Sequence, residues 1–423
     1  MRAFYCQVKN YIPVYIATFF SQLLGVIQGF FVAAVLGPSE YGILTALRMI
    51  SQLNKYGSLG FHTVVSREAS YNYRDKSVVT RIKNNAYTGE LILASILLLI
   101  GVSSSFFVNT RKIELAVIVA SVGLFFSKLA KVINTEAIIE KKYKTYSTVL
   151  AVTGMLTMIG VIATVKYLGI FSSIGIPIFS SGVAIFIGLR YLEHRFTFTF
   201  DISEMIRLVR IGVPVILQTV CYGGYRYIER LTILIMYDTT LLGLYGFSYA
   251  VLDNAMTLLL LAPKIRKIRL SEMLADRNFH KVHRMVLKET GMSLVLASCF
   301  VSAVYLLLPE VIRYLLPKYV PAISILKLLS LSLLIRNISP YVNVVLISPL
   351  VNKQSATANL QLISTIFFLG SILYCNHIGV FSFQTFLILD VTGYLIFHAL
   401  HLHLYYKHFY VRYAKDENII NQQ

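Results

Sequence analysis

The chain has 423 residues, of which 56% are hydrophobic and 14% charged, and its mean hydropathy is +0.67. A water-soluble protein of this length could not bury so much apolar surface, so the composition excludes a soluble enzyme or a soluble binding protein. A net charge of +19 would suggest a nucleic-acid partner in a soluble chain, but basic residues have a different explanation in a membrane protein. We therefore expect a membrane protein without a nucleic-acid partner.

Mostly apolar stretches follow one another along almost the whole chain, and each is long enough to cross a bilayer. A hydrocarbon core of about 30 Å needs roughly 20 helical residues, and short polar segments separate the stretches. The sequence thus predicts an all-α, polytopic membrane protein with about 12 transmembrane helices. The spans are expected at 11–36, 41–64, 86–108, 113–133, 146–168, 170–192, 211–236, 240–262, 290–308, 322–347, 355–376 and 380–403.

Lys and Arg concentrate on alternate connections and on the span ends that flank them, for example in 67–83 and 264–288. By the positive-inside rule both termini are cytoplasmic, which an even number of spans requires. The basic surplus is therefore mainly a topology signal, and attraction to anionic lipid headgroups is a secondary effect. The opposite side carries only Arg111, Lys112, Lys166, Arg313 and Lys318.

Common catalytic patterns are absent from the sequence, which has no P-loop, no H-E-x-x-H and no G-x-S-x-G. The loops expected outside are short, the longest at roughly 309–321, and leave no room for an external catalytic domain. We therefore expect no enzymatic activity and no cofactor. His398, His401 and His403 suggest a metal site at first sight, but we favour an interfacial belt at the inner end of the last span.

Ionisable residues inside the spans are the most informative feature, because each costs a few kcal/mol at membrane depth unless it faces a partner or water. Arg48 and Lys55 are seven residues apart on the second span, so they share one helical face. The seventh span carries a polar stripe with spacings of four, three and four residues, flanked by Arg226 and Arg230. The stripe consists of Gln218, Tyr222, Tyr225 and Glu229.

Later spans contain further polar positions, and the whole set has two interpretations. The charges could simply pair with one another, since Glu229 lies three residues after Arg226 and an intrahelical ion pair is available. Basic residues outnumber acidic ones, however, so we favour a water-filled cavity with a positive interior. Such a cavity would attract an anion, because Arg presents a planar fork to phosphate or carboxylate oxygens. The later positions are Asp253, Lys327, Arg336, Asn337 and Asp390.

The two halves of the chain repeat each other weakly. The segment 36–42 resembles 241–246, and their Tyr-Gly pairs are 204 residues apart. Both copies leave the membrane on the same predicted side, so the repeat is parallel, as in many transporters. We expect a six-helix bundle at 1–192, a cytoplasmic linker at 193–210 and a second six-helix bundle at 211–423.

Three segments carry a family resemblance: Val35–Gly42 before the second span, the run Arg230–Tyr245, and Leu315–Ala322 before the tenth span. They resemble the Wzx-type polysaccharide-export flippases of the multidrug/oligosaccharidyl-lipid/polysaccharide superfamily. Where members commonly show Asp before the Arg of the seventh span, this chain has Glu229. The resemblance implies a bacterial inner-membrane protein that turns an undecaprenyl-diphosphate-linked oligosaccharide from the cytoplasmic to the periplasmic leaflet. The cargo would be an O-antigen unit for lipopolysaccharide, or a capsule repeat unit.

A flippase of this kind needs a cationic cavity, because a diphosphate cannot cross hydrocarbon without a replacement for its hydration. Alternating access of the two bundles would carry the headgroup across, while the polyprenyl tail stays in lipid. The expected partners are the lipid-linked oligosaccharide, membrane lipids and other polysaccharide assembly proteins. We assign the diphosphate and acidic sugars to Arg48, Lys55, Arg226, Arg230 and Arg336, the sugar hydroxyls to Gln218, Tyr222, Tyr225 and Asn337, and ion coupling to Glu229, Asp253 or Asp390.

Other membrane functions remain as alternatives to glycan export. A cation-coupled multidrug exporter of the same superfamily would also have two six-span bundles, but its lumen should be acidic and aromatic. A membrane oligosaccharide polymerase or ligase should display a large external loop with catalytic Arg or His. Lipid II flippases usually carry two additional spans. The basic lumen and the short external loops therefore favour an exporter of lipid-linked glycans.

Overall fold

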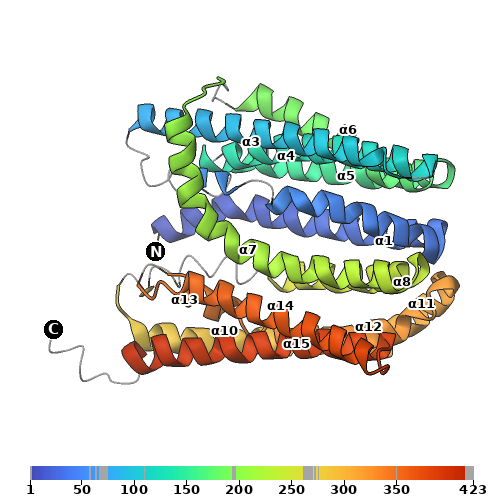
Figure 1. Cartoon of the computed structure of the whole chain (residues 1–423). Helices are drawn as coiled ribbons and strands as arrows, with labels where there is room; N and C mark the ends of the chain where they lie inside the picture. Colours follow the sequence, from blue (N-terminus) through green and yellow to red (C-terminus); the bar gives the residue numbers. More distant parts are fainter. Residues whose placement is uncertain are drawn as a thin grey trace. The chain divides into compact units, whose positions relative to one another are not determined.

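The computed structural model describes residues 2–56, 59–61, 64–65, 75–108, 110–140, 142–192, 197–260, 270, 273–274, 276–348 and 350–414. Within these ranges the backbone alone is described at 2–12, 15, 51–56, 214–215, 218–219, 222 and 258. Every regular element in the described part of the chain is a helix (Figure 1). The all-α fold expected from the sequence is therefore confirmed.

Nine segments of the described chain are long and apolar enough to cross a membrane. The first, Ile16–Ile50, belongs to the kinked helix α1 (Arg2–Tyr56) and represents two crossings. Helices α7 (Ile202–Met236) and α8 (Thr239–Leu259) supply two more, which gives the twelve expected spans. The chain is thus a multi-pass membrane protein.

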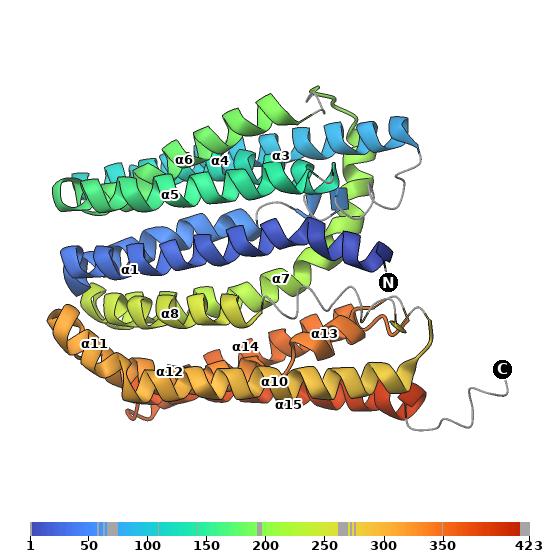
Figure 2. The same cartoon turned by 180° about the vertical axis from the view of Figure 1, so that it is seen from behind.

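Helix α1 folds back on itself at Gly37, where φ is 72° and ψ is 172°. Positive φ at this turn requires glycine, because a Cβ would clash with the backbone. Pro38 follows and cannot donate a helical hydrogen bond, which helps to end the first limb. The two limbs of α1 lie side by side (Figure 2). They correspond to the first and second predicted spans.

The chain divides into two compact units, of which the first contains 1–220 and 233–243. Its helices α3–α6 lie side by side in Figure 1, with α4 packed against α3, α5 and α6. Helix α1 packs mainly against α5 and also contacts α4 and α6. The helices span α3 (Lys76–Ser105), α4 (Arg111–Ile139), α5 (Tyr143–Leu168) and α6 (Ile170–Tyr191).

Buried ion pairs join α3 to α4 in the first unit. The Lys83 ammonium lies 2.5 Å from a Glu136 carboxylate oxygen, and the Tyr87 hydroxyl donates to the other Glu136 oxygen. Lys128 pairs with Glu90 at 3.1 Å, again between buried side chains. Two lysines that the charge pattern assigned to the cytoplasmic side are therefore internal partners of acidic residues.

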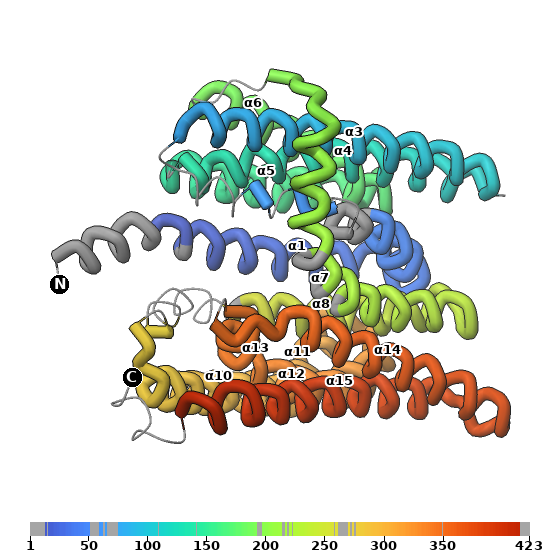
Figure 3. Tube along the Cα trace, turned by 60° about the vertical axis from the view of Figure 1, so that its left-hand side comes forward, coloured from blue at the N-terminus to red at the C-terminus, as the bar shows by residue number. Residues whose placement is uncertain are grey.

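The second unit contains 221–232 and 244–423. Helix α15 packs against α12, α13 and α14, and α10 packs against α12, so these long helices run beside one another (Figure 3). The elements are α10 (Phe279–Leu306), α11 (Leu308–Leu315), η1 (Pro317–Tyr319), α12 (Ala322–Arg336), α13 (Pro340–Leu346), α14 (Gln354–His377), α15 (Phe383–Tyr405) and η2 (Tyr406–Ala414).

Two predicted spans of the second unit differ in detail from the structure. Helix α10 begins at Phe279 and not near 290, because Phe279, Val282 and Val286 are buried in an apolar cluster with Tyr341 and Phe409. The charged residues between them had suggested a loop. The span predicted at 322–347 is two helices, α12 and α13, since Pro340 has no N–H for a continuous helix.

The turn between α7 and α8 packs against the turn of α1 through two glycines. A Cβ on Gly42 would lie 1.7 Å from the Thr239 carbonyl oxygen, and one on Gly243 would lie 1.8 Å from the Pro38 carbonyl oxygen. Only glycine permits this approach. The contact is reciprocal, because residue 239 follows residue 38 by 201 positions and residue 243 follows residue 42 by the same number. This spacing is three residues less than that of the Tyr-Gly pairs, and it defines a register for the parallel repeat.

The chain passes between the units inside α7 and α8, after residues 220, 232 and 243. The expected linker at 193–210 includes residues 202–210, which form the first turns of α7. Asp201 caps this helix by accepting a hydrogen bond from the Glu204 N–H. The domain boundary at 193–210 stays a prediction.

Candidate functional site

The second unit holds a buried cluster of charged and aromatic side chains from α7, α8, α12 and α15. At its centre Glu229 accepts hydrogen bonds from the hydroxyls of Tyr245 and Tyr394, each at 2.9 Å. Tyr394 also lies 3.0 Å from the hydroxyl of Tyr249. The two donors replace part of the hydration that the Glu229 carboxylate loses on burial. We call this set, with the residues described next, the charged cluster.

Three guanidinium groups surround the ring of Tyr249. Those of Arg226, Arg230 and Arg336 lie 5.3, 5.4 and 5.9 Å from its centroid. Cations at this distance from an aromatic face are attracted by the ring quadrupole, and the attraction grows when the pair is desolvated. Tyr249 therefore holds three like charges near one another from two different helices.

A single carboxylate, Asp253, balances two of these cations. It pairs with Arg226 at 3.2 Å and with Arg336 at 3.4 Å. The Asp253 side chain is 35% exposed, whereas Arg336 is only 3% exposed. Within the described residues Arg230 forms no ion pair, although its side chain is buried at 8% exposure. These contacts leave the Arg and Asp253 groups with a surplus of positive charge.

Asp390 is the third acid of the charged cluster. It is fully buried, and neither of its carboxyl oxygens has a hydrogen-bond partner in the described part of the chain. Its carboxyl interacts electrostatically with that of Glu229, and its backbone carbonyl accepts from the Tyr225 hydroxyl at 3.0 Å.

The structure brings together most of the residues singled out in the later spans. The cluster includes Arg226, Glu229, Arg230, Asp253, Arg336 and Asp390. The intrahelical pair of Arg226 with Glu229 does not form, because Arg226 pairs with Asp253 and Glu229 accepts from two tyrosines. The explanation is spatial: α8 and α15 offer better-placed partners than the next turn of α7.

Two residues expected to meet sugar hydroxyls are packed inside the second unit. Tyr225 is buried against Phe368 and Tyr394, with ring centroids 4.9 Å apart in both pairs. Asn337 is also buried, and its amide donates to the Leu333 carbonyl at 2.8 Å. The Tyr225 hydroxyl and the Asn337 amide nitrogen thus donate hydrogen bonds within the protein in this conformation.

The remaining predicted ligands lie elsewhere or beyond the described side chains. Arg48 belongs to the first unit, where its guanidinium lies 3.4 Å from the Tyr41 hydroxyl and 5.6 Å from the Tyr41 ring centroid. The side chains of Lys55, Gln218 and Tyr222 lie outside the described residues. The binding roles of all these residues stay predictions.

Two of the three histidines near the end of the last span are buried, whereas His403 is exposed. His398 and His401 are 4% and 2% exposed, so the expected interfacial belt is wrong for these two. His398 is hydrogen-bonded to the Ser339 hydroxyl at 2.6 Å, and His401 stacks on Phe397. Helix η2 extends α15 beyond them, which places them inside the bundle. No group of three or more His, Cys, Asp or Glu suited to a metal ion occurs among the described residues.

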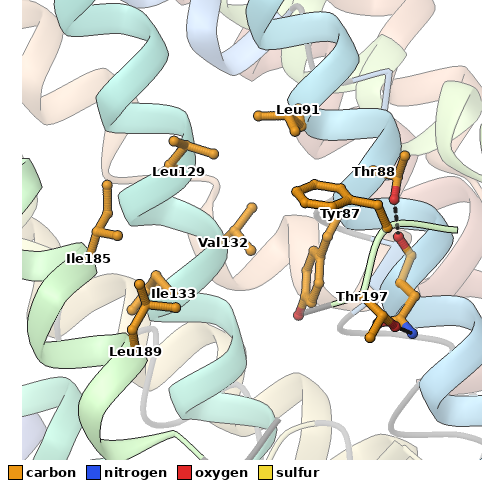
Figure 4. A pocket seen from close by; sticks show the side chains of 11 residues that line it. Tyr87, Thr88, Leu91, Leu129, Val132, Ile133, Ile185, Leu189 and Thr197 are labelled. Carbon is orange, nitrogen blue, oxygen red and sulfur yellow. Dashed lines mark hydrogen bonds between the residues drawn. The ribbon is translucent and has the colours of Figure 1, made fainter. Parts of the chain in front are cut away.

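The first unit contains an apolar cavity of about 280 Å³ among α3, α4 and α6. Figure 4 shows Leu91 and aliphatic side chains from α4 and α6 around this space, with Tyr87 beside it. At its rim Thr88 accepts a hydrogen bond from the backbone N–H of Thr199 at 3.3 Å. Asn84 donates to the Thr197 hydroxyl at 2.5 Å. The segment before α7 is thereby attached to α3.

Comparison with protein families identifies the chain. A family model described as polysaccharide biosynthesis protein matches residues 31–317. The chain belongs to this family. No curated protein matches it in sequence. The resemblance to polysaccharide-export proteins expected from the sequence is thus confirmed at the level of the family.

Solved structures show that this polysaccharide biosynthesis protein has the fold of the MOP superfamily. An inward-facing multidrug resistance MATE family transporter aligns with a TM-score of 0.75 and 14% identity, covering 92% of this chain and 95% of that one. A multidrug resistance MATE family transporter in an outward-facing conformation aligns with a TM-score of 0.68 and 15% identity, covering 95% of this chain and 96% of that one. The lipid II flippase MurJ, in an inward closed conformation, aligns with a TM-score of 0.72 and 13% identity, covering 93% of this chain and 86% of that one. Identities this low show the fold alone.

Sequence reasoning missed the tyrosines that organise the charged cluster of this family member. Tyr245 and Tyr249 were not singled out as site residues, yet they precede Asp253 at intervals of four, so all three share a face of α8. Tyr394 follows Asp390 by four residues on α15. The sequence signal for these tyrosines is an acidic residue inside a span with Tyr four residues before or after it.

Proposed function

We propose that this protein is a flippase for an undecaprenyl-diphosphate-linked oligosaccharide, an O-antigen or capsule repeat unit. It moves the glycan from the cytoplasmic to the periplasmic leaflet by alternating access of its two bundles. Membership of the polysaccharide biosynthesis family supports a glycan substrate. The shared fold of a lipid II flippase, which handles a lipid-linked substrate, supports the transport reaction.

The observation that carries this proposal is that three guanidinium groups gather around the ring of Tyr249. Arg226 and Arg336 share Asp253, and Arg230 is held over Tyr249 without an ion pair in the described chain. A diphosphate that leaves water needs strong donors to replace its hydration, and Arg supplies two parallel N–H groups to such oxygens. Incoming phosphate oxygens would therefore bind Arg230 first and then compete with Asp253.

The other predicted ligands keep their proposed roles. Arg48 and Lys55 of the first unit are proposed to bind acidic groups of the cargo, and Gln218 and Tyr222 of α7 are proposed to contact its sugar hydroxyls. Tyr225 and Asn337 donate to backbone carbonyls in this structure. They would contact sugar hydroxyls only after those bonds exchange, so we assign them to another state of the transport cycle.

Glu229 and Asp390 are the proposed carriers of a coupling proton. They are buried next to each other, and Asp390 has no hydrogen-bond partner for its carboxyl among the described residues. A proton that binds between them would remove the repulsion of two neighbouring carboxylates. Asp253 is the weaker candidate, because two arginines already compensate its charge.

The proposed orientation places the protein in a bacterial inner membrane with both termini in the cytoplasm. Reporter fusions at Asp75 and Asp276 should then report cytoplasm, and a fusion at Pro38 should report periplasm. A periplasmic signal at Asp276 would overturn this topology.

Deletion of the gene in its native host tests the function. The lipid-linked oligosaccharide should accumulate in the cytoplasmic leaflet, and the wild-type gene should restore export. Arg230→Gln should fail to restore it at normal protein abundance. An unchanged glycan with increased sensitivity to cationic drugs would instead favour the multidrug-exporter alternative, which the MATE fold also permits.

A further inference from the structure

A second cavity of the first unit, of about 320 Å³, lies among α1, α4, α5 and α6. Unlike the apolar cavity of Figure 4, it is lined by many hydroxyl and amide groups. None of its lining residues is charged. Four helices of one compact unit therefore line a neutral, polar space, which we call the hydroxyl cavity.

Some polar groups of the hydroxyl cavity are already used by the protein. The Thr157 hydroxyl donates to that of Ser180 at 2.8 Å, and Ser180 donates to the Pro177 carbonyl at 3.1 Å. The Thr153 hydroxyl donates to the Val149 carbonyl at 2.7 Å. The other polar groups have no hydrogen-bond partner in the described part of the chain. They are Ser21 and Gln28 from α1, Asn134 from α4 and Ser181 from α6.

These four side chains are partly exposed to the cavity. At membrane depth such groups pair with water or with a ligand, because leaving one unpaired in hydrocarbon costs several kcal/mol. Two amides and two hydroxyls offer both donors and acceptors, so they match a ligand that also has both. Hydroxyl groups on adjacent carbons of a sugar ring have this property. Water can fill the cavity when no ligand is present, since a water molecule occupies about 30 Å³ of liquid.

Other ligand classes fit the hydroxyl cavity less well. A phosphate or an organic cation finds no opposite charge among the lining residues. A metal ion prefers oxygen ligands within about 2.6 Å and usually carboxylates, whereas this space is wide and has none. Its volume lies near the small end of the range for small-molecule sites, roughly 300–1,000 Å³. It therefore suits a monosaccharide-sized group.

We propose that the hydroxyl cavity binds an uncharged sugar unit of the glycan whose export is proposed above. This inference rests on that proposed function. The amides of Gln28 and Asn134 bind neighbouring sugar hydroxyls, while Gly25 leaves the space that the ring occupies. A Cβ on Gly25 would meet nothing within 4 Å. The first unit thus recognises neutral sugar, and the charged cluster recognises the diphosphate.

Filling the cavity tests the proposal directly. Purified full-length protein in detergent is probed with free glucose, galactose, rhamnose and N-acetylglucosamine, and binding is followed by saturation-transfer NMR. At least one sugar should bind the wild type, and Gly25→Leu should weaken that binding about tenfold or more. Asn134→Leu should weaken it as well, because a buried amide lost from a sugar site leaves hydroxyls unpaired.

Gly182→Leu is the matched control, because Gly182 follows Ser181 on α6, does not line the cavity and also has open space around a Cβ. It should bind sugar like the wild type. Thermal unfolding of each variant identifies any that fails to fold, and Gln28→Leu then replaces it. Absence of binding by all four sugars, or equal binding by Gly25→Leu and wild type, would overturn the proposal.

The sugar-binding experiment is independent of export. If gene deletion leaves the lipid-linked glycan unchanged while the wild type binds a sugar and Gly25→Leu does not, the proposed flippase function fails and the sugar site stands. If deletion causes glycan accumulation and no sugar binds, the flippase function stands and the sugar site fails.

Discussion

The hydroxyl cavity and the charged cluster are built by partly matching spans of the repeated architecture, but the cavity is neutral and the cluster is charged. The cavity is built by α1, α4, α5 and α6, which are spans one, four, five and six. The cluster draws on α7, α12 and α15, which are spans seven, ten and twelve, with α8 added. In the register of 201 residues, Gly25 and Gln28 correspond to Arg226 and Glu229.

Side-chain size and charge explain the difference between the two places. In the first unit a glycine leaves space and an amide lines it, so the site is open and neutral. In the second unit a guanidinium and a carboxylate occupy the equivalent positions, and Tyr225, Tyr249 and Tyr394 fill the volume around them. The comparison teaches that one helical scaffold can hold a neutral cavity or a charged cluster when a few inward positions change.

Removing the shared carboxylate should have the largest effect. Asp253→Ala leaves Arg336 buried without the Asp253 carboxylate, and we expect the unfolding free energy to fall by about 3 kcal/mol. This is the lower end of the range for a broken buried ion pair, because Asp253 is partly exposed. Chemical unfolding in detergent measures it. Asn254→Ala, at the next position of α8, should cost about 1 kcal/mol or less. Similar losses in the two variants would contradict the role of Asp253.

The two arginines of α7 should separate binding from stability. Arg226→Gln breaks an ion pair, so it should lower both export and unfolding temperature. Arg230→Gln should abolish export with little change in unfolding temperature, because no carboxylate pairs with it in the described chain. Arg230→Lys should restore export only in part, since an ammonium lacks the bidentate geometry. Full export by Arg230→Gln would remove Arg230 from the binding site.

Replacing the charged Glu229 by a neutral residue tests the contrast between the charged cluster and the neutral cavity with a smaller expected loss of stability. Glu229→Gln resembles Gln28 of the first unit and can still accept a hydrogen bond from one tyrosine, so we expect a stability loss of about 1 kcal/mol. If Glu229 carries the coupling proton, export by this variant should no longer respond to an imposed proton gradient. Gln28→Leu should keep that response even where its export is slower. A normal gradient response of Glu229→Gln would exclude it as the carrier.

The smallest effect should come from a charge outside both regions. The Ser203 hydroxyl and the Glu204 N–H hold the pKa of Asp201 below its usual value. The ionised Asp201 cap therefore stabilises α7 fully at any pH above the pKa that Asp201 has in the unfolded chain. This stabilisation is lost as the pH falls below about 4 and through the lower pKa that Asp201 has in the folded chain. Asp201→Asn should remove this acid dependence from hydrogen exchange at the start of α7. An unchanged pH profile would show that other groups cause it.

Much of the fold was predictable from local sequence. Twelve crossings followed from apolar length, and the kink of α1 followed a Gly-Pro pair between two such stretches. The start of α10 at Phe279 was not predictable, because its apolar face is buried by Tyr341 and Phe409 from distant segments. Lys83 and Lys128 were counted with the cytoplasmic charges because their partners, Glu136 and Glu90, lie on other helices.

The candidate site was predictable in membership but not in pairing. A charge inside a span is visible in the sequence, so Arg226, Arg230 and Arg336 were expected to line a polar region. Their partners were not visible, because helix packing selects among residues far apart along the chain. Asp253 is 27 residues from Arg226 and 83 from Arg336, and Tyr394 is 165 residues from Glu229.

The sequence by itself determined that the chain crosses the membrane repeatedly, because the cost of placing polar groups in hydrocarbon acts on each segment separately. It also determined to which family the chain belongs. Only the tertiary structure decided that Asp253 is shared, that Glu229 lies between two tyrosines and that four helices line a neutral cavity. Ion pairs and empty volume depend on which side chains meet across helices, and their energies exist only after the helices have packed.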